Sequence, residues 1–318
     1  MSAWADTETV SYIDADGVEK TVTATVIDAK TPNNTSDSFP AGWYVVTEDV
    51  KFTSHIKTTG EIHLILADGK TMTVTVDGTA IHLGGDLTIY GQSLGTGKLI
   101  ANGSQCGISS IYNADNVTIS GGIVTATGDG DAGISADNVT LGGGIVTASS
   151  YRGTVNLTCG YRTADGTTIA SGDDIANGVY NGKTIYPAVA VSYLDEHGVE
   201  RTVPSKDYTI LEGTPGDAYL NGGTYVVCSN ITYTSTVSLD DDVTLILADG
   251  CRMNIGTSES RISGKGINGD CQSLTIYGQT LGTGASFYWV VSASAFISVL
   301  TRSPLICTSM PKRTAGGN

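Results

Sequence analysis

Carboxylates are the first side chains in this sequence that could do chemistry. Three groups stand out: Asp173 with Asp174, Asp129 with Asp131, and Asp240 with Asp241 and Asp242. General acid and base hydrolysis of a glycosidic bond needs two carboxylates held on one site. The adjacent pair and the run of three both lie in glycine-rich or turn-like sequence. We therefore expect no catalytic residues among them.

Two of these groups could instead bind calcium. Asp129 and Asp131 flank a glycine, and the run from Asp240 to Asp242 places three carboxylates together. Carboxylate oxygens are ligands that Ca²⁺ prefers. Neither segment has the Gly-Gly-x-Gly-x-Asp pattern of calcium β-rolls. Calcium at these residues therefore stays an alternative to solvated turns, and the sequence indicates no other cofactor.

Histidine and cysteine show no metal-site spacing. No two of the four histidines have the spacing of zinc ligands, and the six cysteines include no C-x-x-C pair. We expect the histidines to be solvent-facing or packed rings. We expect the cysteines to be mostly small buried residues, and disulfides remain open if the protein is exported.

Aromatic residues are better candidates for a binding site. In the segment LTIYG, side chains of a strand would alternate between its two faces, so that Leu87 and Ile89 point inward and Tyr90 points outward. Tyr277 occupies the equivalent position in a second copy of the segment. An outward tyrosine offers an apolar face and a hydroxyl group, which together suit a sugar ring. Further rings that could extend such a surface are Trp43, Tyr44, Tyr112 and Tyr151. The alternative is that these rings cover coil edges or pack against a hairpin.

The elements that carry these residues belong to a duplicated module. The segment VSYIDADGVEKTV at 10–22 returns as VSYLDEHGVERTV at 191–203. LILADG recurs unchanged in the same register, and LTIYGQ-x-LGTG recurs after an insertion. Each copy begins with two alternating runs around an Asp-x-x-Gly turn signal, which predicts a β-hairpin.

A shorter repeat lies inside the first copy. ADNVTISGGIVTA at 114–126 is repeated as ADNVTLGGGIVTA at 136–148. The spacing between the two segments fits one coil of a parallel β-helix, with two or three short strands and turns. We expect Val117, Ile119 and Ile123 to point inward, with Val124 as a further candidate, and the paired glycines to lie at corners. The sequence thus predicts an all-β, right-handed parallel β-helix of about 22 residues per coil.

Composition and charge agree with this fold and exclude several partners. The chain has 41 Gly among 318 residues, only 15% charged residues and a net charge of −15. An acidic chain repels the phosphates of nucleic acids and anionic membranes. No uninterrupted apolar stretch of about 18 residues occurs, so no membrane insertion is expected.

The repeats divide the chain into four expected parts. Residues 1–9 hold an Ala-Trp-Ala sequence with the form of a signal-peptidase site, and we interpret them as a signal-peptide remnant and leader. Residues 10–187 form a complete hairpin and β-helix module, and residues 188–284 form a truncated second copy. Residues 285–318 carry no Gly before position 316, so we interpret this apolar tail as aberrant, for example frameshifted; a native apolar segment is the alternative.

The segments GWYVVTEDVKF, LILADG, LTIYGQSLGTGKL and NVTISGGIVTATG resemble repeat modules of large exported surface proteins of gut-type anaerobic bacteria. They resemble β-helical carbohydrate-binding modules more loosely. The resemblance implies export, display at the cell surface and contact with glycans or host material.

We therefore expect a non-catalytic, secreted or surface-displayed protein that binds a polysaccharide or a host or cell-surface glycoprotein. Multivalency across repeated modules would strengthen weak contacts. The alternatives are a polysaccharide-degrading enzyme similar to pectin lyases or polygalacturonases, and a structural spacer. The Gly-His-Gly signature of the polygalacturonase family does not occur in the sequence, and Arg261-Ile262 is followed by Ser263 rather than Lys.

Overall fold

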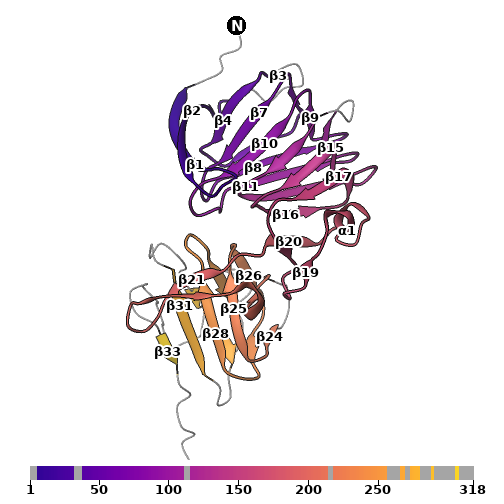
Figure 1. The fold of residues 1–318 in the computed structure, drawn as a ribbon. Coiled ribbons are helices and arrows are strands. Elements are labelled where there is room, and N and C mark those ends of the chain that lie inside the picture. The colour runs from indigo at the N-terminus through magenta and orange to yellow at the C-terminus, as the bar shows by residue number, and fades with distance from the viewer. Residues whose placement is uncertain are drawn as a thin grey trace, which may run out of the picture. The chain divides into compact units, whose positions relative to one another are not determined.

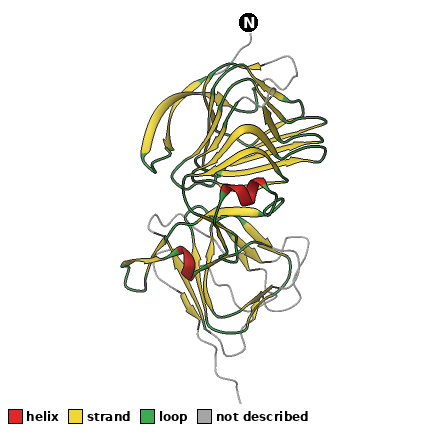
Figure 2. Cartoon of the chain, turned by 45° about the vertical axis from the view of Figure 1, so that its right-hand side comes forward, coloured by secondary structure: helices red, strands yellow, loops and turns green. Residues whose placement is uncertain are grey.

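The computed structural model describes residues 6–31, 38–110, 115–213, 218–255, 266–268, 273–279, 288–289 and 305–307. The protein is nearly all-β, with several parallel sheets, which confirms that part of the prediction (Figures 1 and 2). The chain divides into two compact units. Unit 1 contains residues 1–163 and 167–188, and unit 2 contains residues 164–166 and 189–318. Among the described residues, no helix has the length and apolar character needed to span a membrane.

Unit 1 begins with the expected β-hairpin. β1 (Thr7–Ile13) pairs with β2 (Glu19–Ile27) in antiparallel register, and Gly17 has a φ of 76° in the turn between them. The second half of β2 then pairs in parallel with β4, so that Thr25 lies beside Tyr44. One strand therefore belongs to the hairpin at one end and to the main sheet at the other.

Behind the hairpin, unit 1 contains three stacks of parallel strands, which the chain visits in rotation. Stack A contains β4 (Gly42–Val46), β7 (Ile62–Leu66), β10 (Leu87–Gly91), β13 (Val117–Ile119) and the end of β15 (Ile134–Leu141). Stack B contains β5 (Val50–Phe52), β8 (Thr71–Val76), β11 (Lys98–Gly103), β14 (Ile123–Gly128) and β16 (Ile145–Ala148). Stack C contains β3 (Ser38–Phe39), β6 (Ile56–Thr58), β9 (Ile81–Leu83), β12 (Ile108–Ser110) and the start of β15.

The coils differ in length. In stack A the residues that lie in register on successive strands are Gly42, Ile62, Leu87, Val117 and Val139. The number of residues between successive members of this row is smallest from Gly42 to Ile62 and largest from Leu87 to Val117. The predicted period of about 22 residues per coil holds from Val117 to Val139, which lie in the two most similar segments. The other steps differ because the turns between strands take up fewer or more residues while the strands keep their register.

The core of unit 1 lies between the stacks and is built from alternate residues of each strand. Val117 pairs with Val139 and Ile119 with Leu141, and all four side chains are buried as expected. In β14 the buried residues are Val124 and Ala126, whereas Ile123 is only half-buried, so the inward direction expected for Ile123 was wrong. β16 has the same pattern, with Val146 buried and Ile145 half-buried, because the inward-facing positions change between the end of a stack A strand and the start of the following stack B strand.

Different elements close the two ends of this core. At the first coil Phe39 packs against Tyr44 and Phe52, with ring centroids 5.3 and 6.3 Å apart. At the last coil lie β17 (Tyr151–Leu157), which pairs with β15, and the short helix α1 (Gly172–Ala176), whose Ile175 is fully buried. The remaining strands at this end are β18 (Tyr161–Arg162), β19 (Thr168–Ile169) and β20 (Thr184–Pro187), which pair in antiparallel fashion.

Unit 2 repeats the hairpin and the rotation between three stacks. Its hairpin strands are β21 (Val191–Leu194) and β22 (Glu200–Val203). Its stacks are β23 (Thr209–Ile210), β25 (Gly223–Val227), β28 (Val243–Leu247) and β31 (Leu274–Gly278); β26 (Ile231–Tyr233), β29 (Met253–Ile255) and β32 (Tyr288–Trp289); and β24 (Ala218–Leu220), β27 (Val237–Leu239) and β30 (Ile267–Asn268).

The insertion between the repeated motifs of unit 2 lengthens one coil. Val243 of β28 pairs with Leu274 of β31, whereas in unit 1 Ile62 of β7 pairs with Leu87 of β10. The step in unit 2 is longer, as the insertion between LILADG and LTIYGQ predicts. The paired strands themselves are alike in both units.

Two features distinguish unit 2 from unit 1. Pro204 and the 3₁₀ turn η1 (Ser205–Asp207) separate β22 from β23, where unit 1 has the single strand β2. The expected aberrant tail, residues 285–318, lies mostly outside the described residues. Its two described segments pair with the repeat: β32 lies parallel to β29, and β33 (Leu305–Cys307) lies antiparallel to β31.

Candidate functional site

Four half-buried rings meet on the outer face of stack A in unit 1. Trp43 stacks on His63, with ring centroids 4.2 Å apart and an interplanar angle of 15°. The ring of Tyr90 lies 5.3 Å from that of Trp43, and the ring of Tyr12 lies 5.0 Å from Trp43 and 4.8 Å from Tyr90. We call these four residues the aromatic cluster.

Strand alternation and register bring the cluster together. Trp43 of β4 and His63 of β7 are paired neighbours, and Tyr90 of β10 pairs with Ile65 on the same outer face. The hairpin supplies Tyr12 and covers part of this face, because Ala24 and Val26 of β2 pack with Val45 and Ile65 in a small second core. The predicted outward direction of Tyr90 is therefore confirmed, and its ring also packs against the hairpin.

Polar contacts fix the cluster at its edges. The hydroxyl of Tyr90 lies 3.4 Å from Nδ1 of His63, and Nε2 of His63 lies 3.3 Å from the carboxylate of Glu61. The side-chain amide of Gln92 donates to the carbonyl of Ser11 in the hairpin, at 3.0 Å. Burial raises the pKa of Tyr90 above its ordinary value, so this phenol stays protonated at neutral pH.

Polar side chains continue the face beyond the cluster. In register with His63 lie three threonines on successive strands: Thr88, Thr118 and Thr140. A second row runs beside them, in which Asn116 donates from Nδ2 to Asp86 and Asn138 donates from Nδ2 to Asn116 at 2.9 Å. The threonines and this row together form what we call the polar rows, which present hydroxyl, amide and carboxylate groups along the stack.

Several predicted aromatic candidates do not belong to this surface. Tyr44 is 3% exposed and donates its hydroxyl to the carbonyl of Pro40, because alternation in β4 turns it inward while Trp43 faces out. Tyr151 is also buried in the core, at the end of the coils. Neither ring offers a face to a ligand, so these two candidates were wrong. Tyr112 lies outside the described residues.

Tyr277 occupies the equivalent place in unit 2 but has different neighbours. Its ring lies 4.7 Å from that of Tyr193, which corresponds to Tyr12, and its hydroxyl lies 3.3 Å from the carboxylate of Glu196. The positions of Trp43 and His63 are taken by Thr224 and Thr244. Unit 2 thus keeps the contact between tyrosines of the hairpin and stack A without the stacked Trp and His.

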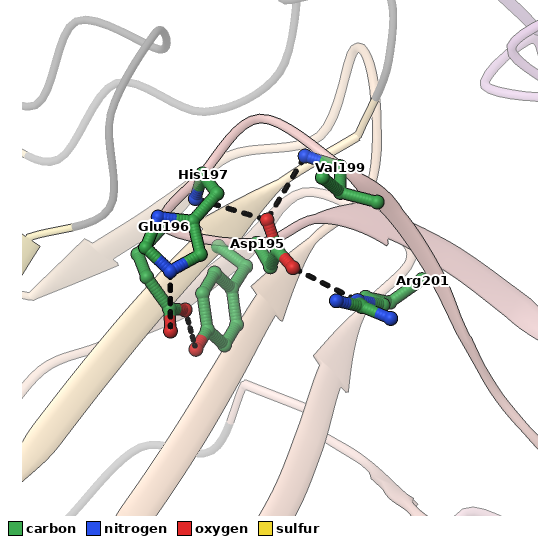
Figure 3. A network of polar contacts seen from close by, with 6 residues as sticks. Asp195, Glu196, His197, Val199 and Arg201 are labelled. Atoms are coloured by element: carbon green, nitrogen blue, oxygen red, sulfur yellow. Dashed lines mark hydrogen bonds and ion pairs between the residues drawn. The ribbon is translucent and has the colours of Figure 1, made fainter.

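The hairpin turn of unit 2 contains a polar network around Asp195 (Figure 3). Its carboxylate accepts from the amides of His197 and Val199, both at 2.9 Å, and from Nε of Arg201 at 2.8 Å. These contacts lower the pKa of Asp195, with the amide of Val199 as the largest cause. The network ties one end of the turn to the other and is explained by the structure of the hairpin alone.

The acids considered as calcium ligands have other contacts. Asp131 forms an ion pair with Arg152 and accepts from the thiol of Cys106, and Asp242 accepts from the amide of Ser273 at 2.7 Å. Asp241 accepts from the amide of the residue that follows it. Asp129 and Asp240 lie in the same two turns, between β14 and β15 and between β27 and β28. Among the described residues, no group of three or more acidic, His or Cys side chains could hold a metal ion.

The adjacent acids Asp173 and Asp174 lie in the first turn of α1, behind the N-cap Ser171. This position suits carboxylates because the N-terminus of a helix carries a partial positive charge. The four cysteines with described side chains, Cys106, Cys159, Cys228 and Cys251, are not joined by disulfides.

The segments that are most alike in the two copies, LILADG and YGQ-x-LGTG, have a structural role in unit 1. The carboxylate of Asp68 accepts from the amides of Leu94 and Thr96, at 2.9 and 3.0 Å, while Gln92 accepts from the amide of Asp68. The two motifs therefore lock neighbouring turns of successive coils together. In unit 2, Gln279 accepts from the amide of Asp249 in the same way.

Sequence reasoning missed Tyr12 and His63 as members of the site. Tyr12 could have been found from the repeated VSY segment, since its alternation matches that of the hairpin strands. Comparisons with protein-family models, with curated proteins and with solved structures gave no match to this chain. The proposals below therefore rest on the arrangement of its residues.

Proposed function

We propose that unit 1 binds a polysaccharide, or the glycan of a surface glycoprotein, along the outer face of stack A without cleaving it. One observation carries the proposal. One register across five strands contains two rings of the aromatic cluster and the three threonines of the polar rows: Trp43, His63, Thr88, Thr118 and Thr140. Tyr12, Tyr90 and the second polar row lie beside this register. An extended sugar chain has the same two kinds of surface, CH faces and hydroxyl groups.

The residues of this face support binding in different ways. Trp43 is half-buried and is held in one orientation by its contacts with His63 and Tyr12. A rigid ring loses little conformational entropy when a ligand stacks on it. Asn116 and Asn138 are likewise fixed by their mutual hydrogen bond, so the polar groups beside the ring are also preorganised.

We further propose that each unit is a right-handed parallel β-helix. The support is the rotation of consecutive strands between three stacks in both units, with parallel neighbours in each stack. Such a fold displays the same outer face on every coil, which suits a repeated ligand. We also propose, from the resemblance of the sequence, that the protein is exported and displayed at a cell surface, where several modules would raise the avidity.

The proposal is tested by affinity electrophoresis and calorimetry of the full chain against a panel of neutral, amino and acidic polysaccharides. For the polysaccharide that binds, Trp43→Ala should weaken binding by at least about tenfold, equivalent to about 1.4 kcal/mol. Tyr219→Ala is the matched control, because Tyr219 is 65% exposed on unit 2 and lies outside the cluster. Unchanged binding by Trp43→Ala would contradict the proposed site.

A second variant separates ligand contact from damage to the hairpin. Thr140→Arg places a large side chain in the polar rows, two strands beyond Tyr90, and should block an extended ligand without touching the aromatic cluster. If no polysaccharide binds, a spacer role is favoured instead. Release of reducing or unsaturated ends from any polysaccharide would contradict the non-catalytic part of the proposal.

A further inference from the structure

Stack C of unit 1 carries a separate group of basic side chains on its outer face. Lys57 of β6 pairs with Ser38 of β3 on one side and with His82 of β9 on the other, and His82 pairs in turn with Ser109 of β12. Lys57 and His82 alternate with the buried Ile56 and Ile81, so they point away from the core.

A third basic group completes the arrangement. His55 precedes β6, and its ring lies 5.4 Å from that of His82 at an interplanar angle of 89°. Within the part of the chain that the structure describes, none of His55, Lys57 and His82 forms a salt bridge with an acid. Three adjacent basic groups without an acidic partner are unexpected in a chain with a net charge of −15.

The electrostatics of His82 reflect this arrangement. Burial is the largest cause that lowers the pKa of His82, and the positive charges of His55 and Lys57 lower it further. The two neighbouring strands place Lys57 on one side of His82 and the uncharged Ser109 on the other. A negative charge placed among these groups would therefore favour the protonated form of the ring.

We propose that His55, Lys57 and His82 form a binding site for an oxyanion, such as the sulfate or carboxylate group of an acidic sugar. Lys57 supplies a fixed positive charge, the two imidazoles donate hydrogen bonds and add charge when protonated, and the hydroxyl of Ser38 is a neutral donor at one end of the row. The hydroxyl of Ser109, at the other end, donates to the carbonyl of Ser110. The site lies on a different stack from the aromatic cluster and does not depend on the proposed glycan-binding function.

Binding of an oxyanion should be coupled to protonation of His82. It should be strongest below the pKa of His82 and should decline as the pH rises and the His82 ring becomes neutral. Conversely, a bound anion should raise the pKa of His82, because linkage requires the effect to be reciprocal.

The test follows the ring resonances of the full chain by NMR as a function of pH, in sodium chloride, sodium acetate and sodium sulfate at equal ionic strength. We expect sulfate or acetate to raise the pKa of His82 above its value in chloride and to change the ring resonances of His55. A larger effect of one salt identifies the preferred oxyanion. His197 is an internal reference, because it is exposed and its neighbour is Glu196.

Two variants make the result specific. Lys57→Gln should abolish the upward shift in sulfate and acetate, whereas Lys98→Gln, on the outer face of stack B, should leave it unchanged. Both substitutions are on the outer surface and keep a long polar side chain. The proposal is overturned if the ring resonances of His55 and His82 are the same in all three salts, or if those of His197 change as much as they do.

Discussion

At the scale of single residues, the repeated acids of this protein hold turns together. Asp14 accepts from the amides of Asp16 and Val18, at 3.0 and 2.9 Å, and forms an ion pair with Lys20 across the hairpin. Asp195 has the same contacts in unit 2, with Arg201 in place of Lys20. A repeated acidic motif that looks suited to chemistry is thus explained by hairpin geometry.

The contacts of Asp14 predict a pH dependence. Its pKa lies below the ordinary value of 3.8, with the hydrogen bond from Lys20 as the largest cause and the amide of Val18 next. A lowered pKa in the folded state means that the charged carboxylate stabilises the hairpin above pH 3.8. This contribution should disappear as the pH falls through the folded pKa.

Lys20→Met should raise the pKa of Asp14 toward 3.8, as measured by NMR titration of its carboxyl carbon. Asp195 has an equivalent turn in the other unit and should keep its lowered pKa in this variant. An unaltered Asp14 titration would show that the backbone amides alone hold the pKa down.

Asp68 should be more important for stability than the surface acids. Asp68→Ala leaves the amides of Leu94 and Thr96 without their acceptor and should destabilise the protein by about 2 kcal/mol, as measured by urea unfolding. The control is Asp129→Ala, which changes an exposed turn and should alter stability by less than about 0.5 kcal/mol. Equal losses would indicate that the Asp68 network is not a stabilising feature.

At the scale of elements, the sequence predicted the features that recur and missed those that vary. The hairpins, the parallel pairing and the superposition of Val117 on Val139 follow from repeated segments. The uneven coil lengths could not be predicted from a single short repeat, because turns absorb insertions without a periodic signal. The inward side of β14 was misassigned because the turn before it changes which alternate residues face the core, and the local pattern does not show that change.

The candidate site was only partly predictable for a related reason. Alternation correctly predicts that Tyr90 points outward. For the adjacent Trp43 and Tyr44, alternation predicts only that they point to opposite faces of the strand, and it does not indicate which of the two rings faces the core. Tyr12 joins the cluster through contacts between the hairpin and stack A, and His63 joins it through the pairing of β7 with β4. Sequence periodicity indicates the face of a strand, whereas the packing of a second element decides which residues meet there.

Glycines at the corners of the coils should be intolerant of substitution where two backbones meet. A Cβ atom at Gly103 would overlap the carbonyl oxygens of Cys106 and Gly78. Gly103→Ala should therefore destabilise the protein by at least about 2 kcal/mol in urea unfolding.

The control for this substitution is Gly130→Ala. At Gly130 the nearest atom to an added Cβ would be the carbonyl oxygen of Ser104, at 3.2 Å, so a small adjustment accommodates it. We expect a much smaller loss of stability there. Similar losses for the two variants would show that close backbone approach does not limit this corner.

At the scale of the whole molecule, the two units have separate hydrophobic cores. The main core of unit 1 includes Leu99, which is fully buried, and that of unit 2 includes Leu247, which is 2% exposed. Among the described residues, neither main core contains side chains of the other unit. Within the described residues, each copy thus forms a core from its own strands.

Because the two units have separate cores, a cavity made by a substitution in one core should destabilise only the unit that contains it. Leu99→Ala should destabilise unit 1 by about 3 kcal/mol and Leu247→Ala should destabilise unit 2 by a similar amount. Hydrogen exchange read by mass spectrometry should show increased exchange only in the peptides of the substituted unit. Increased exchange in both units for either variant would show that they unfold as one.

The uneven coils also have a consequence for how such a chain can change over time. The step from β28 to β31 is longer than the step from β7 to β10, yet the strands on either side keep the same pairing. Turn length is thus decoupled from the register of the stacks. An inserted peptide at such a turn would be displayed on an unaltered frame, so these positions are natural points for diversification and for grafting foreign epitopes.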